Sequence, residues 1–432
     1  MAETVFNGHA IIIGGGMAGL LAVHAVAGHF ERVTMLERFS LPADIGEHSP
    51  VARRGVPQSR CIHLLMAAGA AAFDELAPGW QQGLLEQGAR PFDACADAII
   101  RTSSGQFARA PSQITAYSAS RALFEQALRR RLPATVSLRT NCRVEGLLSD
   151  PDGGRVRGVR CLDRDTGEEA ALRADLVVDA SGEGSTVSNW ITALPEHGDL
   201  QVEKSVVASG TTYVTRWFEM EPGAAPDWHC LSIAPGSDTG LRSVMFLRAE
   251  LNRWGLVLLS RGGESLPADD ASLMDFVENL RDGELQRALS CAKPVSPIYR
   301  YGSTSNRMMH FDQVGDWPEG LVAVGDAACT LDPCFGLGMT NAARGAALLR
   351  RFLNQHGRAS MSAIQFQKAL GSQNAEPWRL ATGREPDGRP LSGIARLGPL
   401  RDQAPSNPEV AHALLAIQHL LRPANTPQEF VS

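Results

Sequence analysis

Two short apolar runs flank a helical pattern near the N-terminus, and together they predict a strand–helix–strand unit. Residues 10–13 and 33–36 are the apolar runs. Runs of this kind are typical of parallel strands that are buried on both faces. Residues 20–27, between them, form a helical pattern that stops at Gly28. This order predicts a parallel α/β sheet at the start of the chain.

The pattern changes several times further along. A polar loop rich in Pro, Gly and Arg covers residues 41–60, and helical patterns follow at residues 62–76 and 120–132. Residues 136–178 predict short antiparallel strands, because Gly-containing turns separate the runs. The later expected elements are strands at residues 206–215, 243–247, 255–259 and 321–324, and helices at residues 272–280 and 408–421.

Composition and charge describe an ordinary soluble globular chain. Of 432 residues, 44% are hydrophobic and 20% charged, and this length allows two interlocked domains. The net charge of −6 argues against a nucleic-acid partner, which normally requires a basic surplus. No run approaches the roughly 18 apolar residues of a membrane span, and no signal-peptide pattern is visible. The eight cysteines are scattered without C-x-x-C pairs, so we expect a cytoplasmic protein with reduced thiols and no metal site.

A glycine-rich turn joins the first predicted strand to the first predicted helix. It reads Gly14-Gly15-Gly16-Met17-Ala18-Gly19, the G-x-G-x-x-G pattern of dinucleotide-binding units. Gly14 permits the tight turn, Gly16 lets the backbone approach a pyrophosphate, and Gly19 lets helix and strand pack closely. The phosphates would then lie at the positive end of the helix dipole.

Glu37 ends the second predicted strand, 23 residues after Gly14. An acid at this point accepts hydrogen bonds from a ribose diol, and its charge repels a 2′-phosphate. The nucleotide is therefore expected to be FAD or NAD rather than NADP.

A second motif, near residue 325, favours FAD. The strand at residues 321–324 ends in Gly325-Asp326, and Pro333, Gly336 and Gly338 precede a helix that starts near Met339. An acid at a strand end can bind ribityl hydroxyls. A second helix N-terminus can stabilise negative charge on the N1–C2=O edge of a reduced flavin. NAD enzymes have no need of this second site.

The two motifs resemble those of flavoprotein monooxygenases related to para-hydroxybenzoate hydroxylase and squalene epoxidase. Between them the chain has Asp175-Leu-Val-Val-Asp179-Ala-Ser-Gly182, the middle motif of that group. Residues 53–64 and the Pro377-Trp378 segment are most similar to bacterial secondary-metabolite hydroxylases and epoxidases, including polyether epoxidases of lasalocid type. The resemblance covers roughly the whole chain. It is specific for the fold and for FAD, and it says less about the substrate.

The implied fold is a glutathione-reductase-like FAD-binding Rossmann fold (α/β) with an inserted β-sheet substrate domain and C-terminal helices. The implied FAD-binding domain is discontinuous and covers residues 1–75, 110–200 and 303–350. The implied substrate domain covers residues 76–109 and 201–302, and residues 351–432 form a C-terminal helical region.

The resemblance also implies cofactor contacts for individual residues. Residues 14–19 would hold the pyrophosphate, Glu37 the ribose, Arg121 the phosphates, and the Val144 backbone the adenine. Asp326 would bind the ribityl chain, and Gly336, Gly338, Met339 and Thr340 would face the flavin. The other expected cofactor contacts are Arg38, Arg53, Gln58 and Arg60.

The chain departs from the family pattern at two places. The middle motif normally contains Asp-Gly, whereas this chain has Asp179-Ala180-Ser181-Gly182. That motif is associated with NAD(P)H, so the resemblance leaves open whether NAD(P)H reduces the flavin directly or through a separate flavin reductase. Thr340 stands where the family often has asparagine, which is tolerable if backbone N–H groups bind the flavin.

His63, Tyr213 and Pro333 are the candidate substrate contacts. The other aromatic residues of the second β-rich region are expected in the core; they are Trp217, Phe218, Trp228, Phe246 and Trp254. Cys329 and Cys334 share the C-x₄-C spacing of disulfide reductases but lie in the wrong part of the chain, so they are interpreted as packing residues. Flavin halogenases need a Trp-x-Trp element and an early lysine, and this chain has neither.

The implied function is FAD-dependent monooxygenation of a hydrophobic organic substrate with O₂, by epoxidation or hydroxylation, in secondary metabolism. The implied oxidant is a flavin C4a-hydroperoxide, which requires positioning, a dry pocket and flavin electrostatics rather than an acid–base pair. No catalytic residue is therefore assigned. Two alternatives stay open: an FAD-dependent reductase of geranylgeranyl-reductase type, and a binding protein that carries FAD structurally.

Overall fold

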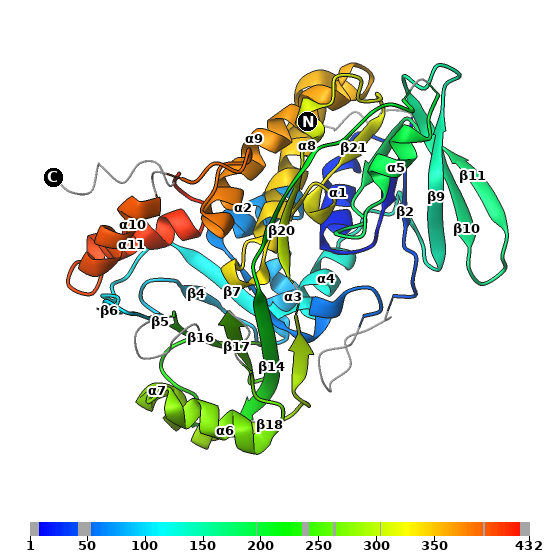
Figure 1. Cartoon of the computed structure of the whole chain (residues 1–432). Coiled ribbons are helices and arrows are strands. Elements are labelled where there is room, and N and C mark those ends of the chain that lie inside the picture. The colour runs from blue at the N-terminus through cyan, green and yellow to red at the C-terminus, as the bar shows by residue number, and fades with distance from the viewer. Residues whose placement is uncertain are drawn as a thin grey trace.

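The computed structural model describes residues 8–41, 53–195, 197–235, 242–261, 265–302, 304–391 and 394–423. Most of the polar loop predicted at residues 41–60 lies outside these ranges. The described chain forms layers around two sheets that lie at opposite ends of the molecule (Figure 1).

A parallel sheet forms the first layer. Its strand order is β21 (Leu321–Ala323), β12 (Leu176–Asp179), β1 (His9–Ile13), β2 (Arg32–Leu36) and β8 (Val136–Arg139). All of its neighbouring strands run parallel. The predicted strand–helix–strand unit is confirmed, because α1 (Met17–Val26) connects β1 to β2.

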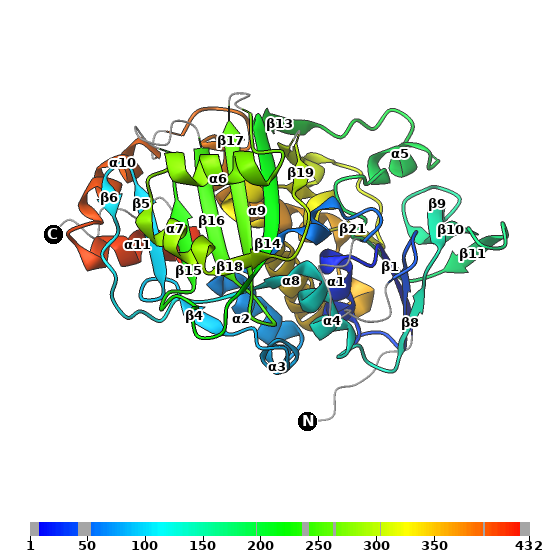
Figure 2. The same ribbon diagram turned by 90° about the horizontal axis from the view of Figure 1, so that it is seen from below.

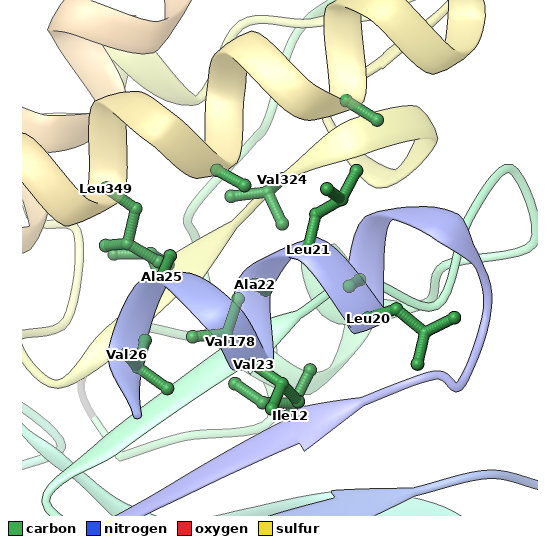
Figure 3. Packing of buried hydrophobic residues seen from close by; sticks show 14 of the residues in the cluster. Ile12, Leu20, Leu21, Ala22, Val23, Ala25, Val26, Val178, Val324 and Leu349 are labelled. Carbon is green, nitrogen blue, oxygen red and sulfur yellow. The ribbon is translucent and has the colours of Figure 1, made fainter. Parts of the chain in front are cut away.

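Helix α1 is buried almost throughout, because it lies between the parallel sheet and α8 (Gly338–Ser360). Figure 3 shows Val23 beside Ile12 of β1, and Ala25 on the side of α1 near Leu349 of α8. Gly19 is required here: a Cβ on this residue would lie 1.8 Å from the Gly14 carbonyl oxygen. The close packing expected from the glycine motif is therefore present.

An antiparallel meander projects from the edge of this layer (Figure 1). It contains β9 (Cys142–Ser149), β10 (Val156–Asp163) and β11 (Glu169–Arg173). The predicted Gly turns connect these strands. The two ends of the region predicted to be antiparallel are different, because residues 136–139 and 176–179 form β8 and β12 of the parallel sheet.

A large mixed sheet forms the second layer, seen nearly face-on in Figure 2. Its order is β18 (Ala292–Pro294), β14 (Thr211–Met220), β17 (Arg253–Arg261), β16 (Arg242–Arg248), β15 (Cys230–Ile233), β5 (Ala98–Thr102) and β6 (Gly105–Gln106), and β19 (Tyr299–Tyr301) also pairs with β14. One face packs on α6 (Asp270–Asn279) and α7 (Gly283–Ser290) through a cluster that includes Phe246, Trp254 and Phe276. The predicted core aromatics of this region are all buried.

Two small sheets and further helices complete the described fold. The small sheets contain β3 (Ile62–Leu65), β7 (Thr115–Ser120) and β4 (Pro91–Asp93), and β13 (Lys204–Ala208), β20 (Ser305–Met309) and β22 (Cys329–Thr330). The other helices are α2 (Ala67–Leu76), α3 (Gln81–Glu86), α4 (Arg121–Arg129), α5 (Val187–Thr192), α9 (Ala363–Thr382), α10 (Ile394–Gln403) and α11 (Pro408–Gln418). None of the helices within the described ranges is long and apolar enough to cross a bilayer.

Two predicted elements are wrong in detail. Residues 62–76 form strand β3 and then helix α2 instead of one helix, because residues 62–65 pair with β7. Residues 206–215 do not form one strand. They divide into β13 and β14, which belong to different sheets, so the chain passes from the small sheet of β13, β20 and β22 to the large sheet at residues 209–210.

Candidate cofactor and substrate site

A cavity of about 840 Å³ lies between the parallel sheet and the large sheet. One side is lined where parallel strands end, with Ile13 of β1, Leu36 of β2 and Ala180 after β12. The other side is lined by residues of β14, β16 and β17. Ligands of open α/β sheets bind outside the carboxyl ends of the strands, which is where this cavity lies.

The N-terminus of α1 opens into the cavity through Gly16, Met17 and Ala18. A Cβ on Gly16 would meet nothing of the described chain closer than the Arg121 guanidinium, at 4.0 Å. The chain therefore leaves free space at the point where a pyrophosphate would approach the helix dipole.

Glu37 holds the glycine turn together from the end of β2. Its Oε2 accepts a hydrogen bond from the Gly15 N–H at 2.9 Å. The same oxygen forms an ion pair with Arg53, whose Nη2 donates to it at 2.7 Å. Its Oε1 accepts from the Phe39 N–H at 3.0 Å. Glu37 lines the cavity, and each of its oxygens already has a protein donor.

Arg53 also contacts a second buried acid, so that Glu37, Arg53, Glu125 and Arg121 form one connected group of charges. Its Nη1 donates to Glu125 Oε2 at 2.7 Å, and Arg121 Nε donates to Glu125 Oε1 at 2.9 Å. Burial by itself would raise the pKa of Glu125, but Arg121 and Arg53 outweigh burial and hold that pKa below its ordinary value. Arg53 thus links the acid predicted for the ribose to the arginine predicted for the phosphates.

Asp326 also lines the cavity, from the turn after β21. Burial raises the pKa of its carboxyl group to about 6, although Arg121 and Arg307 act in the opposite direction. Gly336 has a left-handed backbone, with φ +65°, and precedes the start of α8 at Gly338. Both glycines line the cavity, so the N-terminus of a second helix faces it.

The large-sheet end of the cavity is mostly apolar. The apolar lining residues there are Ile62, Leu64, Met245, Leu247, Val257, Leu259 and Leu331. Tyr301 adds a half-buried phenol to the lining. Burial raises the pKa of Tyr301, so this phenol stays a hydrogen-bond donor.

His63 lies in β3, and its Nδ1 is 3.0 Å from the carbonyl oxygen of Cys61. Burial and the charge of Arg121 lower the pKa of His63 to about 3. The imidazole is therefore neutral at ordinary pH, with Nδ1–H as the donor to Cys61. Its Nε2 is then an acceptor for a group in the cavity.

The cavity brings together most of the residues predicted for cofactor and substrate. The predicted residues that line it are Gly14, Gly16, Met17, Ala18, Glu37, Arg38, Arg53, Gln58, His63, Arg121, Val144, Tyr213, Asp326, Pro333, Gly336, Gly338 and Met339. Four others do not line it, and these are Gly15, Gly19, Arg60 and Thr340. Arg60 stacks on Tyr299, with its guanidinium carbon 4.9 Å from the ring centre. Thr340 turns its hydroxyl to the Met66 N–H at 3.3 Å.

Several residues of the site were missed from the sequence. Ser181 lines the cavity with a buried hydroxyl that has no partner in the described part of the chain. Arg307 joins two loops of the cavity by donating to the carbonyl oxygens of Glu183 and Asp326. Glu125 had a local signal, since it lies one helical turn after Arg121. Tyr301 had none.

The two loop cysteines are free thiols. Burial, with the nearby Asp332, raises the pKa of Cys334 to about 12, so its thiol is protonated. Within the described residues, no group of three or more His, Cys, Asp or Glu side chains is placed to hold a metal ion.

Comparison with known proteins finds one distant relative by sequence and several solved structures with the same fold. No family model matches the sequence. The chain is 27% identical over 391 residues to Protein Rv3254 of Mycobacterium tuberculosis, covering 86% of this chain and 79% of that protein.

Solved structures of flavin-dependent proteins are similar along nearly the whole chain. The brominase Bmp2 aligns with a TM-score of 0.68 at 14% identity, covering 96% of this chain and 94% of that one. PqsL of P. aeruginosa, solved with 2-aminobenzoylacetate, aligns with a TM-score of 0.64 at 18% identity over 95% and 100%. A third, 2-methyl-3-hydroxypyridine-5-carboxylic acid oxygenase, aligns with a TM-score of 0.59 at 19% identity over 96% and 97%. The chain has the same fold as these proteins. The fold class expected from the sequence is therefore confirmed.

Proposed function

We propose that the protein is an FAD-dependent monooxygenase that acts on a hydrophobic organic molecule. One observation carries the proposal: a single cavity joins the glycine turn and the Asp326 turn to an apolar surface of the large sheet. A dinucleotide needs the first two features, and an apolar substrate needs the third. The 2-aminobenzoylacetate bound to PqsL supports a small organic substrate in a cavity of this fold.

The residues present fit FAD. Free space at Gly16 suits the pyrophosphate, and Arg121 reaches the same place. The unpartnered Ser181 hydroxyl gives the cofactor a further polar contact. Asp326 suits the ribityl hydroxyls, and the N-terminus of α8 suits the negative charge that a flavin gains on reduction.

Reduced FAD, when bound, supplies an electrophilic oxygen atom from O₂ to an electron-rich alkene or aromatic ring. The protein's part is to position the substrate and exclude water. The apolar residues of β16 and β17 form a dry wall for that purpose. Tyr301 donates, and His63 accepts, a hydrogen bond, so the two can orient a polar group on the substrate. Epoxidation or hydroxylation in secondary metabolism fits this site, with NAD(P)H reducing the flavin directly or through a separate reductase.

Halogenation is not part of the proposal, although Bmp2 shares the fold. The chain has three lysines, Lys204, Lys293 and Lys368, and none of them lines the cavity.

The test is to purify the full chain with FAD, supply a reductant, and screen aromatic and alkene compounds under ¹⁸O₂. The proposal expects a yellow protein and a product that carries one heavy oxygen atom. A colourless protein that binds no added FAD would refute the flavin site.

A further inference from the structure

Asp332 is fully buried and lies just before the loop that leads to α8. Its Oδ1 accepts hydrogen bonds from the Tyr213 hydroxyl and from the Cys334 N–H, the latter at 2.9 Å. Its Oδ2 accepts from the Thr304 hydroxyl at 3.0 Å, and its own N–H donates to Asn306 Oδ1 at 2.8 Å. Burial by itself would raise the pKa of Asp332, but hydrogen bonds from Ser209, Tyr213 and Cys334 outweigh it and lower that pKa.

The partners of Asp332 come from the two places where the chain passes between the large sheet and the small sheet of β13, β20 and β22. Tyr213 is in β14, soon after the first crossing at residues 209–210, and Thr304 ends the second crossing, from β19 to β20. The crossings also contact each other, because the Ser209 hydroxyl lies 2.7 Å from the Thr304 hydroxyl. One carboxylate therefore ties the large sheet to the loop at residues 333–337.

That loop faces the cavity at the proposed flavin end. Pro333, Cys334 and Gly336 line it, and Gly338 begins the helix whose N-terminus points there. The Gly336 N–H bonds within the loop, to Pro333. Arg261 of β17 also contacts the loop, with its Nη2 3.3 Å from Cys334 Sγ, and the buried Leu337 packs in an apolar cluster. Asp332 is the charged acceptor among these contacts. A buried charged acceptor with several donors fixes its neighbours more strongly than neutral hydrogen bonds do.

We propose that Asp332 is a positioning residue. Its hydrogen bonds fix the loop at the flavin edge relative to the large sheet, where substrate binds. This rests on the proposed function for the identity of the two ligands. Tyr213 is then a structural contact rather than a substrate donor, because Asp332 and the Cys334 N–H occupy its hydroxyl. That differs from its expected role as a substrate contact.

The test uses the full chain and four variants. Thr304→Val removes the hydroxyl donor and Thr304→Ser keeps it, so the pair separates the hydrogen bond from packing. Tyr213→Phe removes the phenol donor, and Asp332→Asn removes the charge of the acceptor while an amide oxygen stays in place. Hydrogen–deuterium exchange should be faster at residues 333–337 in the Val, Phe and Asn variants, with the Ser variant like wild type and α1 unchanged in all.

Flavin binding provides the second readout. The same three variants should bind FAD about tenfold more weakly, the size expected from one hydrogen bond to a charged group, and the midpoint potential of bound flavin should shift with them. Tyr213→Phe should cost less in the Asp332→Asn background than in the wild type, because the phenol then donates to a neutral acceptor instead of a charged one.

Wild-type exchange and wild-type FAD affinity in Tyr213→Phe and Thr304→Val would overturn the proposal, as would equal damage from Thr304→Ser. If Asp332→Asn does not fold, the Thr304 pair and Tyr213→Phe still decide. If the wild-type protein binds no FAD, the proposed function fails, while the exchange measurement still tests the role of Asp332.

Discussion

Arg53 and Glu37 form a buried ion pair, with Arg53 Nη2 2.7 Å from Glu37 Oε2. Arg53 bonds Glu125 on its other side at the same distance. One arginine thus balances two carboxylates whose side chains are 8% and 3% exposed. Because the same Glu37 oxygen receives the Gly15 N–H, this pair also supports the turn that is proposed to hold the pyrophosphate.

Replacing Arg53 with glutamine should destabilise the protein by about 3–5 kcal/mol, because buried Glu37 loses its charged partner and Glu125 keeps only Arg121. Urea unfolding of the apoprotein measures this change. Arg54→Gln is the matched control, since Arg54 is the exposed neighbour, and it should cost less than about 0.5 kcal/mol. Equal, small losses from both variants would show that the pair contributes little.

Gly16→Val should give a folded protein that lacks FAD. The backbone of Gly16 has φ −80° and ψ −170°, which any residue can adopt, and its Cβ would enter free space in the cavity. The expected result is a normal circular dichroism spectrum without yellow absorbance. Gly19→Ala is the contrast, because its Cβ would collide with the Gly14 carbonyl oxygen and should reduce soluble yield. A Gly16→Val protein with full yellow absorbance would show that the pyrophosphate does not bind next to Gly16.

The glycine unit could be predicted because its signals are local: a buried strand, a turn and a helix follow one another within thirty residues. The Arg53–Glu125 and Tyr213–Asp332 contacts could not, because they join residues that are 72 and 119 positions apart. The strand β3 could not be predicted from the sequence for a similar reason. Its apolar residues continue into α2, and only pairing with the distant β7 separates the two elements.

Asp326→Asn should remove a pH dependence of FAD binding. The carboxyl group has a pKa of about 6 in the folded protein without cofactor. Ribityl hydroxyls donate to the ionised form, so binding favours ionisation and lowers this pKa. FAD affinity should therefore rise as the pH increases through 6 in the wild type and stay flat in the variant. Fluorescence titrations at pH values on both sides of 6 measure it. ADP should compete equally in both proteins, since the adenosine end is unchanged.

Dependence on O₂ separates an oxygenase from a reductase with the same fold. An oxygenase uses substrate only when O₂ is present, and its product gains oxygen from O₂. A reductase turns over without O₂ and transfers a hydride from reduced flavin to carbon. Flavin reduced with a deuterated donor, then mixed anaerobically with substrate, should therefore leave the substrate unlabelled and the flavin reduced. Admission of O₂ should restore oxidised flavin and form product together. Deuterium on carbon under anaerobic conditions would contradict the monooxygenase and leave the FAD site intact, because both chemistries use the glycine turn and Asp326.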